Sequence, residues 1–235
     1  MNAAQLFHEG KVRQAQQALS EWLRNRPADI SQRTFLFELL CFSGDWERAE
    51  RHLSILAKGD PQKEMGAVLY LSALHAERTR HDMAAKGARP ESLAASRLCG
   101  TLNGQPFHSI SDADPAIGTR FEIFAAGSYS LLAFEHIQSI RIEAPRRLRD
   151  TLWTPAIVRT NSSLHAGELG EVLVPVLYPF SWKSPYESVW LGRETRWAEE
   201  HGHEQPAGQK MLLVDDREVP LLEVRELEFD TPEVG

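Results

Sequence analysis

The chain of 235 residues is poor in cysteine and has no long apolar run. Its two cysteines, Cys41 and Cys99, are too few for a disulfide framework and lack the spacing of a metal site. They fit a reducing compartment. No apolar stretch reaches the roughly 18 residues of a membrane span. The amino terminus lacks the charged and apolar regions of a signal peptide. We therefore expect a soluble, cytoplasmic protein.

Positive charge is also in short supply, since 26 Lys and Arg stand against 33 Asp and Glu, a formal net charge of -7. Proteins that bind nucleic acids usually present a basic face, so the composition argues against a nucleic-acid partner. The sequence has no glycine-rich phosphate-binding loop. It also lacks the G-x-S-x-G motif of a serine nucleophile. We expect neither catalysis nor a cofactor.

The sequence does contain a motif that occurs twice near the amino terminus, 34 residues apart. Gly10, Ala15, Leu19 and Pro27 recur as Gly44, Ala49, Leu53 and Pro61. This is the period of the tetratricopeptide repeat, a helix–turn–helix that stacks on its neighbours and offers a concave surface to other proteins. Glycine permits the positive φ of the turn, and proline is expected to end the second helix of each unit. A generic helical bundle is the alternative.

The apolar pattern changes from helical to strand-like near residue 100. We expect a long helix over 63–84, a short helix over 91–98, and then a small, mostly antiparallel β domain. The fold class is therefore α+β, with a tetratricopeptide-like domain over 1–99 and a β-rich domain over 100–235. Pro175 and Pro220 predict strand edges or bulges. The expected strands are 120–125, 129–134, 139–143, 156–159, 171–177, 210–214 and 218–227, with a helical turn over 145–152 and a loop-rich insertion over 179–208.

Three segments carry a resemblance to a known family: SDADPAIGTRFEIFAAGSYSLLAFEHIQSIRIEAPRRLRDTLWTPA, GEVLVPVLYPFSWKSP and GQKMLLVDDREVPLLEVREL. With the helical repeats, they resemble the ImpE/TagJ family of accessory proteins of bacterial type VI secretion. The resemblance implies a non-enzymatic adaptor that binds a helix of the small contractile-sheath subunit. It also implies a link to the AAA+ ATPase that disassembles the contracted sheath.

The repeat register predicts which side chains face the concave surface. We predict partner contacts from Phe7, Thr34, Glu38, Cys41, Phe42, Met65, Val68, Ser72 and His75, with Ala4, His8 and Ser31 on the same face. Several of these residues are apolar, which suits an amphipathic helix laid into a groove. Alternatively, the β domain or a partial third repeat packs there and uses the same residues as core.

Two clusters of polar residues offer a chemical alternative. Asp112 and Asp114 could hold a metal in a hydrolase, although Asp before Pro is also ordinary turn chemistry. His201 and His203, flanked by glutamates, could bind an ion adventitiously. A metal-dependent hydrolase therefore competes with the adaptor, as does a general scaffold with another client.

Arginines and tryptophans complete the candidates. The one local excess of positive charge is formed by Arg141, Arg146, Arg147 and Arg149. Glu143 and Asp150 are the simpler candidates for their partners, within the chain itself. Trp153 is expected in the core. Trp182, in a loop rich in Ser and Pro, is the better candidate for an interface. Trp190 and Trp197 stay open between the two roles.

Overall fold

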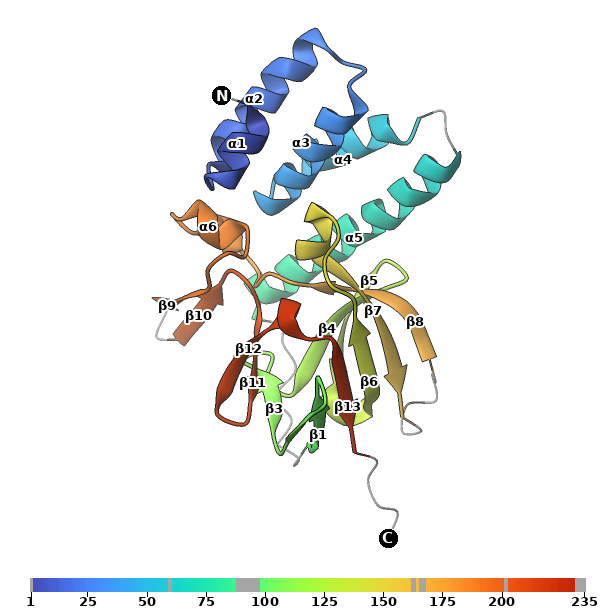
Figure 1. The fold of residues 1–235 in the computed structure, drawn as a ribbon, viewed down its shortest axis with the longest axis vertical. Helices are drawn as coiled ribbons and strands as arrows, with labels where there is room; N and C mark the ends of the chain where they lie inside the picture. The colour runs from blue at the N-terminus through green and yellow to red at the C-terminus, as the bar shows by residue number, and fades with distance from the viewer. Residues whose placement is uncertain are drawn as a thin grey trace.

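The computed structural model describes residues 2–58, 61–87, 98–161, 164, 168–200 and 203–230. Helices make up its amino-terminal part and antiparallel strands most of the remainder, so the expected α+β class is confirmed (Figure 1). The helices of the first part are α1 (Ala3–His8), α2 (Val12–Asn25), α3 (Ile30–Phe42), α4 (Trp46–Leu56) and α5 (Pro61–Ala85).

The predicted repeat appears as two helix–turn–helix units, α1 with α2 and α3 with α4. Gly10 and Gly44 occupy the two turns with φ of 76° and 70°, a conformation that side chains with a Cβ rarely adopt. Ala15 and Ala49 are fully buried, which lets the paired helices approach closely. Asp29 begins α3, because its carboxylate accepts a hydrogen bond from the Gln32 amide.

The prolines of the repeat behave differently from one another. Helix α2 ends at Asn25, shortly before Pro27, as expected. Pro61 is the first residue of α5 rather than the end of α4, so that prediction was wrong. The first turn of a helix needs no amide hydrogen bond, and proline is therefore favoured there. The expected long helix over 63–84 is confirmed, whereas the short helix over 91–98 falls almost wholly outside the described residues.

Most of the β strands form one eight-stranded sheet in the order β2-β1-β13-β6-β7-β8-β4-β5, in which every recorded pairing is antiparallel. A three-stranded sheet, β12-β11-β3, and the hairpin β9-β10 stand beside it. The strands are β1 (Gly100–Leu102), β2 (Gln105–Phe107), β3 (Ile110–Asp112), β4 (Arg120–Ala125), β5 (Ser128–Ala133), β6 (Ile137–Ile142), β7 (Trp153–Thr160), β8 (Glu168–Pro175), β9 (Arg196–Glu200), β10 (His203–Ala207), β11 (Met211–Val214), β12 (Arg217–Pro220) and β13 (Glu226–Phe229).

Three details of the β domain depart from the sequence-based expectation. The strand expected over 218–227 divides into β12 and β13, which join different sheets. Pro220 ends the edge strand β12, as expected, whereas Pro175 ends β8, which is an interior strand. The insertion over 179–208 is more regular than expected, since it contains the short helix α6 (Glu187–Trp190) and the hairpin β9-β10.

The helical part and the β domain share one apolar core. A cluster that begins in α1–α5 continues into Trp153, Val176, Leu177, Trp190 and Leu191 of the β domain, and a second cluster fills the large sheet. Helix α5 lies across the top of the sheet at this junction (Figure 1). None of the helices in the described ranges is both long and apolar enough to cross a membrane.

Candidate partner-binding groove

Part of the expected concave surface is filled by the chain itself. Cys41 and Phe42 are only 1% and 2% exposed, and both belong to the core shared with the β domain. Glu38 is 9% exposed and pairs with Arg149 at 3.3 Å. Burial raises the pKa of Glu38, and the Arg149 guanidinium opposes that shift. The expectation that these three residues line an open surface was wrong, and the core interpretation holds for them.

The insertion of the β domain packs on the turns of the two repeats. Its Trp182 ring lies 2.5 Å from where a Cβ on Gly44 would stand, so it packs directly on the turn of the second repeat. Its Arg193 donates hydrogen bonds of 3.0 Å to the carbonyls of Phe7 and His8, at the end of α1. Both repeat turns are therefore covered by residues of the same chain.

Three other residues predicted to contact a partner, Phe7, Thr34 and His75, do not line the groove described below. Phe7 is half-buried, edge-on to Phe35 at 5.6 Å between ring centroids and beneath the Arg193 guanidinium. Thr34 donates its hydroxyl to the Ile30 carbonyl at 2.9 Å. His75 is exposed on α5.

The remaining predicted residues, Met65, Val68 and Ser72, lie on one face of α5. Met65 is 77% exposed and Val68 62%, and the adjacent Leu69 is 49% exposed. They border a hollow whose other wall is the sheet, formed by Phe124 of β4, Val172 of β8 and neighbouring residues. This arrangement leaves apolar side chains facing open space between a helix and a sheet.

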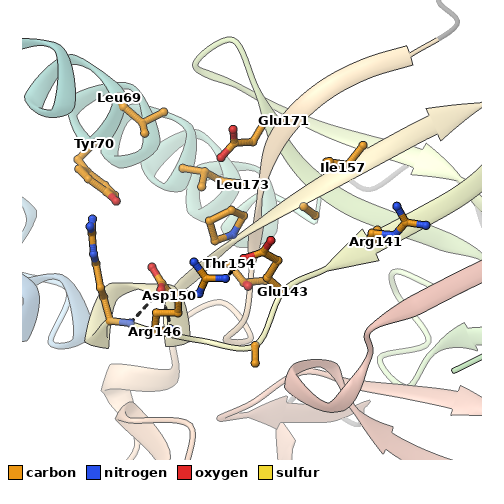
Figure 2. Close-up of a pocket in the computed structure, with 14 residues that line it drawn as sticks. Leu69, Tyr70, Arg141, Glu143, Arg146, Asp150, Thr154, Ile157, Glu171 and Leu173 are labelled. Carbon is orange, nitrogen blue, oxygen red and sulfur yellow. Dashed lines mark hydrogen bonds and ion pairs between the residues drawn. The ribbon is translucent and has the colours of Figure 1, made fainter.

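A second hollow, of about 490 Å³, continues the first and shares Leu69, Glu171 and Leu173 with it. Leu69 reaches it from α5 and Leu173 from β8, and Arg141 lies on the opposite side of the view from Leu69 (Figure 2). We call the two hollows together the α5–sheet groove. Its lining residues are Met65, Val68, Leu69, Tyr70, Ser72, Ala73, Phe124, Ala126, Gly127, Arg141, Glu143, Ala144, Arg146, Arg147, Asp150, Thr154, Pro155, Ala156, Ile157, Glu171, Val172 and Leu173.

The charged end of the groove is built on a short turn, Leu148–Thr151. The Asp150 carboxylate accepts the backbone amides of Arg146 and Arg147 at 2.9 Å each. The Arg146 side chain pairs with Glu143 at 2.8 Å. Glu143 and Asp150 thus contact the arginine cluster, as expected if the arginines have partners within the chain. The expected helical turn over 145–152 is confirmed.

A buried network of charges fixes α5 to the sheet. Arg80 donates to both carboxylate oxygens of Glu122 on β4 at 2.8 Å, to Glu77 at 3.0 Å and to the Leu177 carbonyl at 2.8 Å. Glu77 in turn accepts the Trp153 indole N–H at 2.9 Å. A bidentate pair of this kind fixes the orientation of the helix as well as its position.

Lys210 extends the network by contacting Glu122 and, at 2.6 Å, Asp112. Burial alone would raise the pKa of Glu122, but Arg80 and Lys210 outweigh it and hold that pKa well below its ordinary value. Burial raises the pKa of Asp112, and the Lys210 ammonium group offsets this rise only in part. The two carboxylates therefore share one buried ammonium group.

The same contacts bear on the hydrolase alternative. One Asp112 oxygen accepts the Asp114 amide at 2.9 Å and the other pairs with Lys210, while Asp114 accepts the Ala116 amide at 2.9 Å. This is a turn held by its own backbone, as turn chemistry predicts. Within the described residues no cluster of three or more potential metal ligands occurs, and His201 lies outside them.

The tryptophans divide between core and local contacts. Trp153 is buried as expected, and Trp190 is buried as well. Trp182, the predicted interface residue, packs edge-on against Trp46 at 5.2 Å and against His81 at 4.4 Å. Trp182 is therefore largely occupied by contacts within the chain.

Sequence reasoning missed the sheet side of the groove. Ile157 is 43% exposed on β7, where it shares the outward face of the strand with Arg159. An apolar residue in that outward register was the available signal. Leu173 lies in an apolar run and reads as core, so nothing in the sequence marks it. Leu69 could have been found from its four-residue spacing to Met65.

The chain joins a helical-repeat unit to an antiparallel β domain through a common core, and an open groove lies at the junction. These features define a class of α+β proteins suited to bind other proteins. A sequence model of the ImpE protein family matches residues 104–228, more than half of the chain, and the chain belongs to this family. It is 28% identical over 264 aligned positions to the type VI secretion system accessory component TagJ of Pseudomonas aeruginosa strain PAO1. That alignment covers 98% of this chain and 92% of the relative.

A solved structure shares the fold. The crystal structure of protein VPA1032 from Vibrio parahaemolyticus superimposes with a TM-score of 0.84 at 24% identity, covering 97% of each chain. The arrangement of repeats and β domain is therefore common to both proteins.

Proposed function

We propose that this chain is a non-enzymatic accessory component of type VI secretion that holds a helix of the small sheath subunit in the α5–sheet groove. Membership of the ImpE family supports the assignment to the type VI secretion system, and the name of the Pseudomonas relative supports the accessory role. The sheath subunit as partner comes from the resemblance noted in the sequence.

The observation that carries the proposed site is the exposed apolar face of α5. Met65, Val68 and Leu69 lie three and four residues apart on one helix, the spacing into which a second helix packs. Covering an apolar side chain of this size fully contributes roughly 1.5–3 kcal/mol. Three such side chains can offset a substantial part of the cost of association.

The buried charges support an absence of catalysis. Glu122 is engaged by Arg80, Lys210 and the Tyr129 hydroxyl, so its oxygens face protein groups rather than a pocket. Asp112 is likewise held by Lys210 and a backbone amide. Carboxylates committed in this way hold the fold together and are poorly placed to bind a substrate.

Titration calorimetry of the purified full-length chain with the purified small sheath subunit tests this proposal. We expect Val68→Asp to weaken binding by about tenfold or more, because a carboxylate would have to be covered by the partner helix. Ile55→Asp is the matched control, since Ile55 is 46% exposed on α4, away from the groove. Unaltered binding by Val68→Asp, or no binding by the unmodified chain, would contradict the proposal.

The link to the AAA+ ATPase and the cytoplasmic location stay predictions that rest on the resemblance and the composition.

A further inference from the structure

The α5–sheet groove changes character along its length. Around Met65 and Val68 its lining is apolar or neutral apart from Glu171, whereas its other part is bordered by Arg141, Arg146 and Arg147. A chain with a net charge of -7 thus places three arginines along one part of this apolar groove.

These arginines are accessible to a partner. The side chains of Arg141 and Arg146 are 66% and 78% exposed, and their present partners, Glu226 and Glu143, are exposed as well. Ion pairs at such exposed positions contribute about 0–1 kcal/mol. A carboxylate from a partner can therefore replace Glu143 or Glu226 at little cost in stability.

The lining also holds Glu143, Asp150 and Glu171, of which Glu143 pairs with Arg146. Asp150 accepts the amides of Arg146 and Arg147, which fixes its carboxylate against the backbone of its own turn. Glu171 lies on β8, in the part of the lining that both hollows share with Leu69 and Leu173. The three arginines therefore line only the hollow that lacks Met65 and Val68, and Glu171 lies in the part common to both hollows.

We propose that the segment bound in the α5–sheet groove is an amphipathic helix with an acidic end, and that this end lies against Arg141, Arg146 and Arg147. Its apolar face covers Met65, Val68 and Leu69. This inference rests on the proposed function and adds the charge pattern of the partner and its direction in the groove. In the reversed orientation the acidic end would lie against the neutral lining around Met65 and Val68 and would lose its contacts with the arginines, so the arginines select one direction.

The test uses the full-length chain and the small sheath subunit in titration calorimetry at about 50 and about 500 mM salt. We expect the double variant Arg146→Glu and Arg147→Glu to bind about tenfold more weakly than the unmodified chain at the lower salt concentration. We expect this difference to shrink at the higher concentration, because salt screens exposed charges. Circular dichroism melting verifies that the variant is folded.

The control is a double variant with the same change in net charge, Arg51→Glu and Arg217→Glu, at exposed positions on α4 and β12. It should bind like the unmodified chain. A second variant, Glu143→Gln, removes the present partner of Arg146 and should bind more tightly. Equal weakening by both double variants would show an effect of net charge alone and overturn the inference.

The inference and the proposed function fail differently. If the unmodified chain binds the sheath subunit, Val68→Asp weakens binding and Arg146→Glu with Arg147→Glu changes nothing, only the acidic-end inference is overturned. If the unmodified chain does not bind, both are overturned.

Discussion

At the scale of single residues, two arginines on α5 show how burial decides the value of an ion pair. Arg78 pairs with Glu50 at 2.9 Å, and both side chains are well exposed. Arg80, two residues further on, is enclosed and donates to Glu122, Glu77 and a carbonyl. Water competes for the first pair and is excluded from the second.

We predict that Arg80→Ala lowers the free energy of unfolding by about 3–5 kcal/mol, because Glu77 and Glu122 lose their shared buried cation. Arg78→Ala on the same helix should cost about 0–1 kcal/mol. Urea denaturation of both variants and the unmodified chain measures the difference. Comparable costs for the two arginines would show that the buried network does not fix α5 to the sheet.

The depressed pKa of Glu122 gives a pH dependence with a defined sign. Because its folded pKa lies well below the ordinary value of 4.5, Glu122 contributes stability above that value and loses it as the pH falls. We predict that Glu122→Gln flattens the decline in unfolding free energy between about pH 5 and about pH 3. Urea midpoints across this range give the slopes, and identical slopes for variant and unmodified chain would contradict the prediction.

At the scale of elements, the two repeat turns look alike in sequence and differ in surroundings. Gly10 and Gly44 both have positive φ. A Cβ on Gly10 would come no closer than 3.8 Å to the Arg193 side chain, whereas a Cβ on Gly44 would overlap the Trp182 ring. The insertion of the β domain is packed tightly on the second turn only.

Alanine substitutions separate these two effects. Gly10→Ala should cost about 1–2 kcal/mol from backbone strain alone. Gly44→Ala should cost about 1–3 kcal/mol more, because the indole ring of Trp182 has to move. Thermal unfolding of both variants, followed by tryptophan fluorescence, provides the comparison. Equal losses would mean that Trp182 does not pack against this turn in solution.

Local elements were the most predictable part of the fold. The 34-residue period located the helical units, and the alternation over 120–125 and 129–134 located the hairpin of β4 and β5, because each depends on neighbours in sequence. Pro61 was misassigned because proline ends one helix or begins the next with nearly the same local signature. Division of the final strand into β12 and β13 depends on two different sheets, which no local pattern records.

At the scale of the whole molecule, the β domain decides which part of the helical surface is open. The insertion covers the two repeat turns, Cys41 and Phe42 belong to a core shared with the β domain, and Met65, Val68 and Leu69 of α5 stay exposed. The repeat register correctly placed Met65, Val68 and Ser72 on one helix face. It could not show which positions of that face the rest of the chain would cover.

Long-range pairings explain why the junction escaped prediction. Arg80 meets Glu122 across 42 residues of sequence and Lys210 meets Glu122 across 88. No spacing rule connects such residues, and each alone reads as an ordinary surface charge. The groove depends on this junction, since α5 and the sheet form its two walls.

Site-specific cross-linking tests the central claim, an open groove on α5 that receives a partner helix, most directly. A photoreactive residue placed at Met65 in the full-length chain should cross-link to the small sheath subunit on illumination. The same residue at Ile55, on α4, should give no cross-link. Cross-linking from Ile55 and none from Met65 would contradict the account.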